Sequence, residues 1–351
     1  MNDFATLTGL VSQYSPSGYE RQAVKWLVRR MKALCYDDTF IDEAGNAVGM
    51  MGSGAKQVIL LGHIDTAPGE IRVKQVNGAL YGRGAVDAKG PLACFTDAVA
   101  RVGPVKGWQF IVIGAVEEER DSEGARYVAT RYKPDYAIIG EPNHWDRVAL
   151  GYKGSATAEI AIQRAQSHTA SRTETAAEAA IGLWLNLKAY ADSFNMGRTR
   201  AFAQLLLTLL DINSSSNEFE QEASLKIGAR LPLDMPPDDW YEQLNTLAGE
   251  AQVTRPGYAV PAWECEKNNR LVRAFLSGIR SQSGEPRFVY KTGTADLNIV
   301  APVWKCPAVV YGPGDSALDH TPHEQLTLQE YSRSVAVLCD ALQQLVKNQP
   351  E

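Results

Sequence analysis

The sequence predicts an α/β fold: a mostly parallel sheet with helices on both faces, plus a smaller inserted α+β domain. Three short runs are apolar on both faces, as central strands of such a sheet are, and they cover residues 58–62, 108–116 and 136–140. Stretches with a helical spacing of apolar residues separate these runs. After residue 153 the strands alternate apolar and polar residues, which indicates a second unit with a one-sided sheet.

The chain begins with a helix and two strands. Ser17 and Glu20 form an S-x-x-E pattern, which predicts a capping box at the start of a helix over 18–35. Apolar residues recur there at helical spacing. Strands over 46–52 and 57–63 follow, and the second is the first of the buried runs.

A hairpin is predicted next, because residues 71–84 alternate around Asn77-Gly78, a pair that favours a type I′ turn. Pro91 stands in the first turn of a helix over 91–102, where proline is tolerated. The remaining elements of this region are a strand over 108–116, a helix over 122–132 and a strand over 136–142.

The inserted domain is predicted to mix strands and helices. Its strands cover 156–163, 201–213 and 223–233, and its helices lie within 173–194 and 234–251. From about residue 276 the chain returns to a helix, a Gly-rich loop, the apolar run 307–314 and a closing helix over 332–346. We therefore predict one discontinuous domain formed by 1–153 and 276–351, with residues 154–275 inserted.

Composition disfavours several classes of partner and compartment. The formal charge of −6 disfavours binding to nucleic acid or to an anionic membrane surface. No apolar run approaches the roughly 18 residues that span a bilayer, and no signal-peptide pattern is present. The cysteines form neither a disulfide framework nor a CxxC metal site; they are Cys35, Cys94, Cys265, Cys306 and Cys339. We expect a cytoplasmic protein.

Potential metal ligands follow each of the three buried runs and occur in one Gly-rich loop. They are His63 and Asp65 after the first run, Glu117, Glu118 and Glu119 after the second, Glu141 after the third, and Asp87 in the loop 82–90. Because the carboxyl ends of parallel strands face one crevice, we expect these groups to converge. Carboxylates so placed repel one another unless a cation neutralises them. Imidazole together with carboxylate oxygen suits zinc at a catalytic site, so the sequence predicts a metal site.

Five motifs, in order, resemble the metal-binding motifs of the dizinc aminoacylase and carboxypeptidase family, which includes acetylornithine deacetylase, succinyl-diaminopimelate desuccinylase and glutamate carboxypeptidase. They are GHIDT, GRGAVDAKG, VEEER, IIGEP and DHTPHE. The resemblance covers the whole chain. It implies a dizinc catalytic domain with two Zn²⁺ per subunit (Co²⁺ as an alternative metal), an inserted lid and dimerisation domain, and a homodimer.

The resemblance also implies a role for each matching residue. Asp87 would bridge the two metals, and Asp65 would orient the imidazole of His63. The family often has a cis peptide bond after the bridging residue, here Asp87–Ala88. The expected zinc ligands are His63, Asp87, Glu119, Glu141 and His320.

Two of these assignments have a close alternative. In the acidic run, the spacing to a following G-x-R assigns Glu118 as general base and Glu119 as ligand, but the extra acid Glu117 leaves a shift by one residue open. His323 competes with His320 as the distal ligand. His320 is favoured, because the H-x-P-x-E pattern of the family then falls in register.

The implied chemistry is hydrolysis of an amide bond. A metal-activated water attacks the carbonyl, and Glu118 takes its proton and delivers it to the leaving amine. His168 resembles the lid histidine that stabilises the oxyanion, which dimeric members supply from the other subunit. Lid segments and the Gly-rich loop 291–302 would hold the substrate; the residues expected to do so are Lys291, Gly293, Thr294, Asn217 and Arg230.

Within the family, the motifs look most like the branch that serves lysine and arginine biosynthesis. That branch releases lysine or ornithine from a small acidic amino-group carrier protein of the LysW type, or from the N-acetylated amino acid. Other candidates are an N-acetylornithine deacetylase, a dipeptidase or desuccinylase, and an inactive relative that only binds metal. An acidic carrier calls for basic surface, for which Arg172, Arg198 and Arg200 are available.

Overall fold

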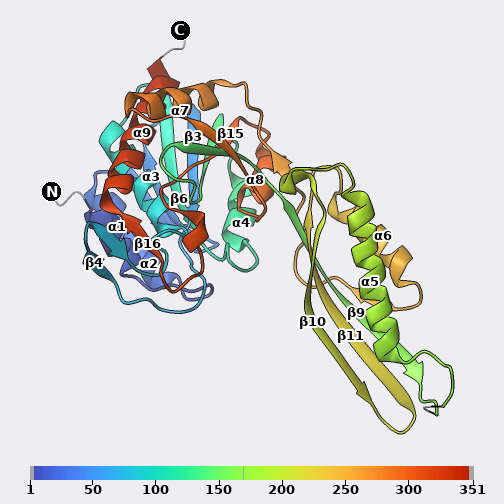
Figure 1. Cartoon of the computed structure of the whole chain (residues 1–351). Helices are drawn as coiled ribbons and strands as arrows, with labels where there is room; N and C mark the ends of the chain where they lie inside the picture. The colour runs from blue at the N-terminus through green and yellow to red at the C-terminus, as the bar shows by residue number, and fades with distance from the viewer. Residues whose placement is uncertain (1–3, 169, 348–351) are drawn as a thin grey trace. The chain divides into compact units, whose positions relative to one another are not determined.

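The computed structural model describes residues 4–168 and 170–347, which form two compact units (Figure 1). The first unit contains the chain up to Leu150, Cys265–Tyr290 and the chain from Ala295 onwards. The second unit contains Gly151–Glu264 and Lys291–Thr294. Residue 276, where we expected the return to the first unit, lies inside helix α7 (Arg270–Ser281). This amphipathic helix packs closely on a later helix of the first unit, so the return begins at Cys265 instead.

Most strands of a large mixed sheet lie in the first unit. In spatial order its strands are β1 (Asp38–Ile41), β2 (Ala47–Met51), β6 (Trp108–Ala115), β3 (Lys56–His63), β7 (Tyr136–Gly140), β15 (Ala308–Val310), β8 (Arg147–Tyr152) and β13 (Trp263–Glu264), and β14 (Arg287–Lys291) also pairs with β8. The four central strands β6, β3, β7 and β15 are parallel to one another, and β2 and β8 flank them antiparallel. The prediction of a mostly parallel sheet is confirmed at its centre.

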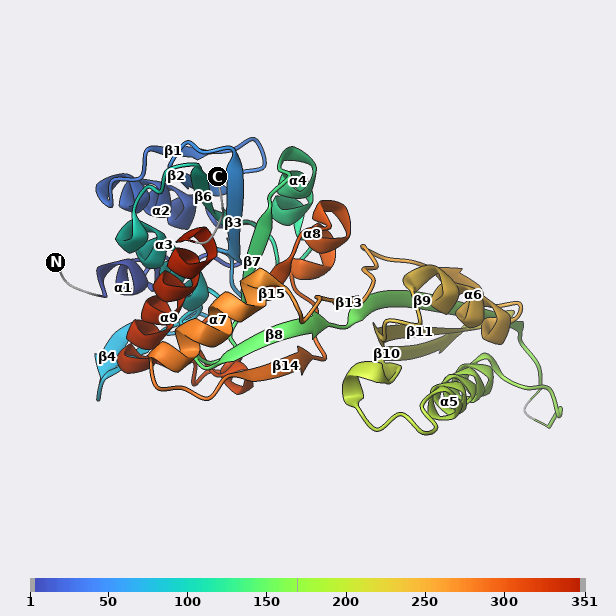
Figure 2. The ribbon, with the colours of Figure 1, turned by 90° about the horizontal axis from the view of Figure 1, so that it is seen from above.

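Helices cover both faces of the central strands (Figure 2). One face carries α3 (Lys89–Val102) with α9 (Leu328–Lys347) and α7, and the other carries α4 (Glu123–Arg131) and α8 (Leu297–Trp304). Two further helices, α1 (Ala5–Val11) and α2 (Arg21–Ala33), adjoin α3 and β1–β2. Gly140 lets α3 approach the strands, because a Cβ there would lie 2.9 Å from the Phe95 ring. Helix α3 therefore packs closely on β7 at this point.

A small sheet brings the end of the chain to the loop that precedes α3. Its order is β16 (Gln325–Thr327), β5 (Ala79–Tyr81) and β4 (Lys74–Val76), all antiparallel. Asn77 and Gly78 join β4 to β5 with φ of 49° and 76°, as the predicted type I′ turn requires. Pairing of β16 with β5 places residues 320–324 beside the loop 82–88.

The capping box expected at the first long helix does not form. Helix α2 begins at Arg21, and its N-cap residue, Glu20, makes no side-chain capping bond. The Ser17 hydroxyl instead donates to Asp65 over 2.8 Å, and Glu20 accepts from the backbone N–H of Gly18. The prediction was wrong because a carboxylate distant in sequence competes for the serine.

The second unit has a four-stranded antiparallel sheet in the order β10 (Leu206–Ser216), β11 (Glu220–Leu231), β9 (Gly154–Ala165) and β12 (Gln252–Thr254). Helices α5 (Ala176–Phe194) and α6 (Pro237–Ala248) pack on its apolar face, in one shared core. A strand over 201–213 was predicted, but residues 201–203 form a short 3₁₀ helix, η1 (Ala201–Ala203). The buried ammonium of Lys153 donates hydrogen bonds to the carbonyls of Ala201 and Phe202, which keeps these carbonyls out of the strand ladder.

Among the described residues, no helix combines the length and the apolar character that crossing a membrane requires.

Candidate active site and metal centre

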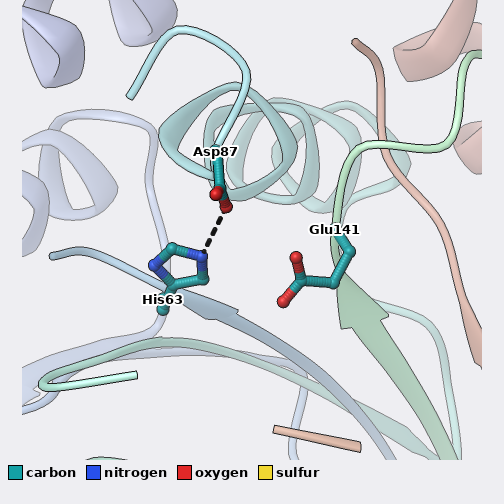
Figure 3. A group of neighbouring side chains, drawn as sticks. All are labelled: His63, Asp87 and Glu141. Carbon is teal, nitrogen blue, oxygen red and sulfur yellow. Dashed lines mark hydrogen bonds and ion pairs between the residues drawn. The ribbon is translucent and has the colours of Figure 1, made fainter. Parts of the chain in front are cut away.

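The three buried strands end side by side, and the predicted ligands follow them. The order β6-β3-β7 aligns His63 with Ala115 and Gly62 with Gly140. Glu141, the residue after β7, therefore faces His63 across the strand ends (Figure 3). Asp87, just before α3, points towards the same place from the other side. The predicted convergence of these groups is what the structure shows.

Two triads of potential ligand atoms share one aspartate. His63, Asp87 and Glu141 each offer a ligand atom within 4.8 Å of the others, as do Asp87, Glu119 and His320. The Asp87 carboxylate divides between the two histidines: Oδ1 lies 3.1 Å from Nε2 of His63, and Oδ2 lies 3.1 Å from Nε2 of His320. Nε2 of His320 is also 2.9 Å from Oε1 of Glu119. Asp87 thus presents one carboxylate oxygen to the histidine of each triad.

Asp65 contacts the histidine of the first triad on the side opposite to Asp87. Nδ1 of His63 lies 3.1 Å from the Asp65 backbone carbonyl and 3.4 Å from its Oδ1, so Nε2 is left to face Asp87. The Asp65 carboxylate also accepts from the backbone N–H groups of Glu118 and Glu119, each over 3.1 Å. The same buried side chain thereby orients the imidazole and the acidic turn after β6.

The electrostatics of the cluster call for a cation. Burial raises the pKa of Glu141 and Glu118 well above the usual carboxyl value; the nearby His63 opposes this shift, and neighbouring carboxylates add to it. Burial and the nearby Asp87 raise the pKa of Glu119 as well. In Asp87 burial acts in the same direction, but hydrogen bonds from His320 and His63 outweigh it and lower its pKa. Divalent cations at the two triads would neutralise these groups, and the mixed imidazole and carboxylate donors suit zinc or a similar ion.

The side chains of the three consecutive acids, Glu117, Glu118 and Glu119, have different neighbours. Glu117 adopts a left-handed conformation with φ of 63°, and its carboxylate pairs with Arg120 over 2.9 Å. Glu119 belongs to the second triad. Glu118 belongs to neither triad, but its pKa responds to His63, Glu141 and Asp296, so it lies beside the cluster.

Of the two histidines in the last motif, only one is in a triad. His320 adopts a positive φ of 60° and brings Nε2 to Asp87 and Glu119. His323 is in neither triad, and its backbone N–H donates to the Thr321 hydroxyl.

The candidate residues of the second unit are spread over it. Arg230 donates to the Thr294 hydroxyl over 3.2 Å, and the Lys291 carbonyl accepts from the backbone of Lys153. A Cβ added at Gly293, in the same loop, would meet no atom within 4 Å. His168 is exposed in the segment after β9.

Asn217 is not brought together with Arg230. It lies in the turn between β10 and β11, where its Oδ1 accepts from the backbone of Phe219 and Glu220, whereas Arg230 pairs with Leu206 at the other end of that hairpin. Arg198, one of the arginines considered for a carrier, is held by Asp234 over 2.7 Å.

The sequence did not point to one buried acid that lies near the triads, Asp296. Asp296 is 2% exposed, and no group in the described chain donates to its oxygens with normal hydrogen-bond geometry. Burial raises its pKa to about 7, although Ser122 and Arg126 lie near enough to oppose that shift. Its only sequence signal was its place in the Gly-rich stretch 291–302.

The parallel central strands carry two triads of potential metal ligands at their carboxyl ends, an arrangement that suits a metal-dependent hydrolase. The model of the peptidase family M20/M25/M40 matches residues 59–344 of the chain, which therefore belongs to this family of metallohydrolases acting on amide bonds.

Curated relatives resemble the chain over nearly its full length. A LysW-lysine hydrolase of Deinococcus radiodurans is 44% identical over 345 residues, covering 96% of this chain and 95% of the relative. A putative LysW-lysine/LysW-ornithine hydrolase of Thermococcus kodakarensis is 39% identical, covering 97% and 91%.

Solved structures share the fold at low sequence identity. An M20 family metallo-carboxypeptidase from Sulfolobus solfataricus aligns with a TM-score of 0.77 at 16% identity, covering 98% of this chain and 99% of the other. A tripeptidase from Staphylococcus aureus aligns with a TM-score of 0.77 at 19% identity, covering 99% and 98%.

Proposed function

We propose that this protein hydrolyses the amide bond that joins lysine or ornithine to an acidic amino-group carrier protein of the LysW type, in amino-acid biosynthesis. The observation that carries the proposal is the 44% identity to a LysW-lysine hydrolase over almost the whole of both chains. The two triads around Asp87 supply the donor set for two zinc ions, with cobalt as an alternative metal.

Metal ions held by the triads would polarise the scissile carbonyl and lower the pKa of the attacking water. Glu118 is the proposed general base: it is a carboxylate beside the triads that belongs to neither, so it can take a proton from the water and hand it to the leaving amine. The water oxygen bonds to the carbonyl carbon, the C–N bond breaks, and the amine leaves with the proton. Asp65 keeps His63 and the Glu118 backbone in place throughout.

A panel of substrates tests the proposal most directly. Carrier-linked lysine and carrier-linked ornithine should be hydrolysed faster than N-acetyl-lysine, N-acetyl-ornithine, a succinylated diamino acid or a dipeptide. Thorough chelation should abolish the activity, and added Zn²⁺ or Co²⁺ should restore it. Preference for N-acetyl-ornithine would identify a deacetylase instead, and no hydrolysis of any of these by the metal-loaded protein would favour an inactive relative.

We also propose a homodimer formed through the second unit. In the described chain β10 is an edge strand, and its Leu210 and Ile212 are 53% and 46% exposed. A groove of about 330 Å³ lies between α5 and β10 and is lined in part by Ile181 and Ile212. An edge strand with exposed apolar side chains tends to pair with another chain, and a second copy offers the same edge. His168, exposed in this unit, is then the proposed oxyanion donor from the partner copy.

Complementation between two inactive variants tests the dimer and His168 together. His168→Ala should lower kcat by about a hundredfold or more, through loss of one oxyanion donor. Mixed with Glu118→Gln and allowed to exchange subunits, it should recover about a quarter of the wild-type activity, because half the dimers then hold one complete site. No recovery despite verified exchange would contradict action across the dimer.

The cytoplasm is the proposed location. All five cysteines are free thiols in the structure, as is usual in a reducing compartment.

A further inference from the structure

Glu324 is a fully buried carboxylate beside the site that belongs to neither triad. It is 0% exposed and lies directly before β16, four residues after His320. The motif HTPHE contains it, but neither the predicted ligand set nor the proposed mechanism uses it.

Both oxygens of Glu324 are engaged by the loop that carries Asp87. Oε1 accepts from the backbone N–H of Val86 over 2.9 Å and from that of Asp87 over 3.0 Å. Oε2 accepts from Nη1 of Arg83 over 3.0 Å, and the Arg83 side chain is itself 7% exposed. Glu324 is in neither group of potential ligand atoms, and both of its oxygens are engaged by the Asp87 loop instead.

These bonds connect two ligands that are more than 200 residues apart in the chain. Glu324 holds the backbone of Asp87, and His320 is in the same short segment as Glu324. Backbone pairing adds to the connection, because the N–H of Gly82 donates to the Glu324 carbonyl over 3.3 Å. Arg83 extends the network by donating from Nε to the carbonyl of Gly69 over 2.9 Å.

We propose that Glu324, paired with Arg83, is a positioning residue that sets the Asp87 carboxylate between His63 and His320. The inference rests on the proposed function, because it assumes that the triads bind metal. Without the anchor, the loop 82–88 can shift, and the two oxygens of Asp87 no longer face both histidines together. Residues that support metal ligands in this way change metal affinity by about 10- to 100-fold when replaced.

The test compares Glu324→Gln with Asp97→Asn in the full-length protein. Asp97 is a matched control, because it is also a buried carboxylate of the first unit, hydrogen-bonded by Thr6 and Tyr331, but is in neither triad. Zn²⁺ affinity is measured by competition with a chelator, and Tm is measured in the metal-free state. We expect Glu324→Gln to bind Zn²⁺ about 10- to 100-fold more weakly. We expect Asp97→Asn to lower Tm and leave Zn²⁺ affinity unchanged.

The proposal is overturned if Glu324→Gln binds Zn²⁺ with wild-type affinity. It is also overturned if Asp97→Asn, at a similar fall in Tm, loses as much Zn²⁺ affinity as Glu324→Gln does. Should Glu324→Gln fail to fold, Arg83→Gln is the second variant: it removes the charge partner but keeps a donor, and unchanged affinity there would also overturn the proposal. Failure of the wild-type protein to bind Zn²⁺ at all would instead contradict the proposed function.

Discussion

Replacing Glu118 by Gln is expected to lower kcat by about 10²- to 10⁴-fold while both metal ions remain bound. Glu118 is in neither triad, so an amide at this position leaves every ligand atom in place. The amide cannot take a proton from water, and it cannot pass one to the leaving amine. Both steps of proton transfer are therefore lost together, and steady-state kinetics with metal analysis of the same sample measures the result.

Glu117→Gln is the matched control for this variant. Its carboxylate pairs with Arg120 and is in neither triad, so near-wild-type kinetics are expected. Near-wild-type rates in Glu118→Gln, together with a severe loss in Glu117→Gln, would move the role of base to Glu117. That outcome would mean that the motif of the family aligns with the acidic run one residue earlier, an alternative that the sequence leaves open.

Replacing Asp87 by Asn is expected to weaken both metal sites and to abolish hydrolysis. Each of its oxygens faces a different histidine, at 3.1 Å in both cases. Asn offers one carbonyl oxygen and no negative charge, so it cannot serve both triads. We expect Zn²⁺ affinity to fall by more than about 100-fold, since replacing even a supporting residue costs 10- to 100-fold.

The measurement is the metal content per chain after dialysis against a weak chelator, alongside turnover at saturating Zn²⁺. Asp97→Asn is again the control, because Asp97 lies on α3, the helix that Asp87 precedes, and is buried without being in a triad. If Asp87→Asn keeps either ion at wild-type affinity, Asp87 does not bridge the two sites.

Local sequence patterns were sufficient to predict the central strands and three of the candidate metal ligands. His63 and Glu141 each follow a run that is apolar on both faces, and Asp87 stands in a Gly-rich loop before a helix. Parallel strands bring their carboxyl ends to one edge, so local patterns were enough to predict that these residues meet. The hairpin at Asn77-Gly78 was predictable for a similar reason, since its turn type depends on two adjacent residues.

Local sequence patterns could not predict which side chains, far apart in the sequence, bond to one another. Ser17 has the local pattern of a helix cap but bonds to Asp65, 48 residues away. Glu117 and Glu119 are chemically alike, and only the backbone turn after β6 sends one to Arg120 and the other to His320.

The sequence by itself determined which residue types stand at the strand ends, because strand and helix periodicity is a local property of the chain. Tertiary structure decided which carboxylate faces which imidazole and that Glu324 anchors the Asp87 loop from 237 residues away. The physical reason is that a hydrogen bond or an ion pair depends on distances of about 3 Å, which only the packing of the whole unit sets.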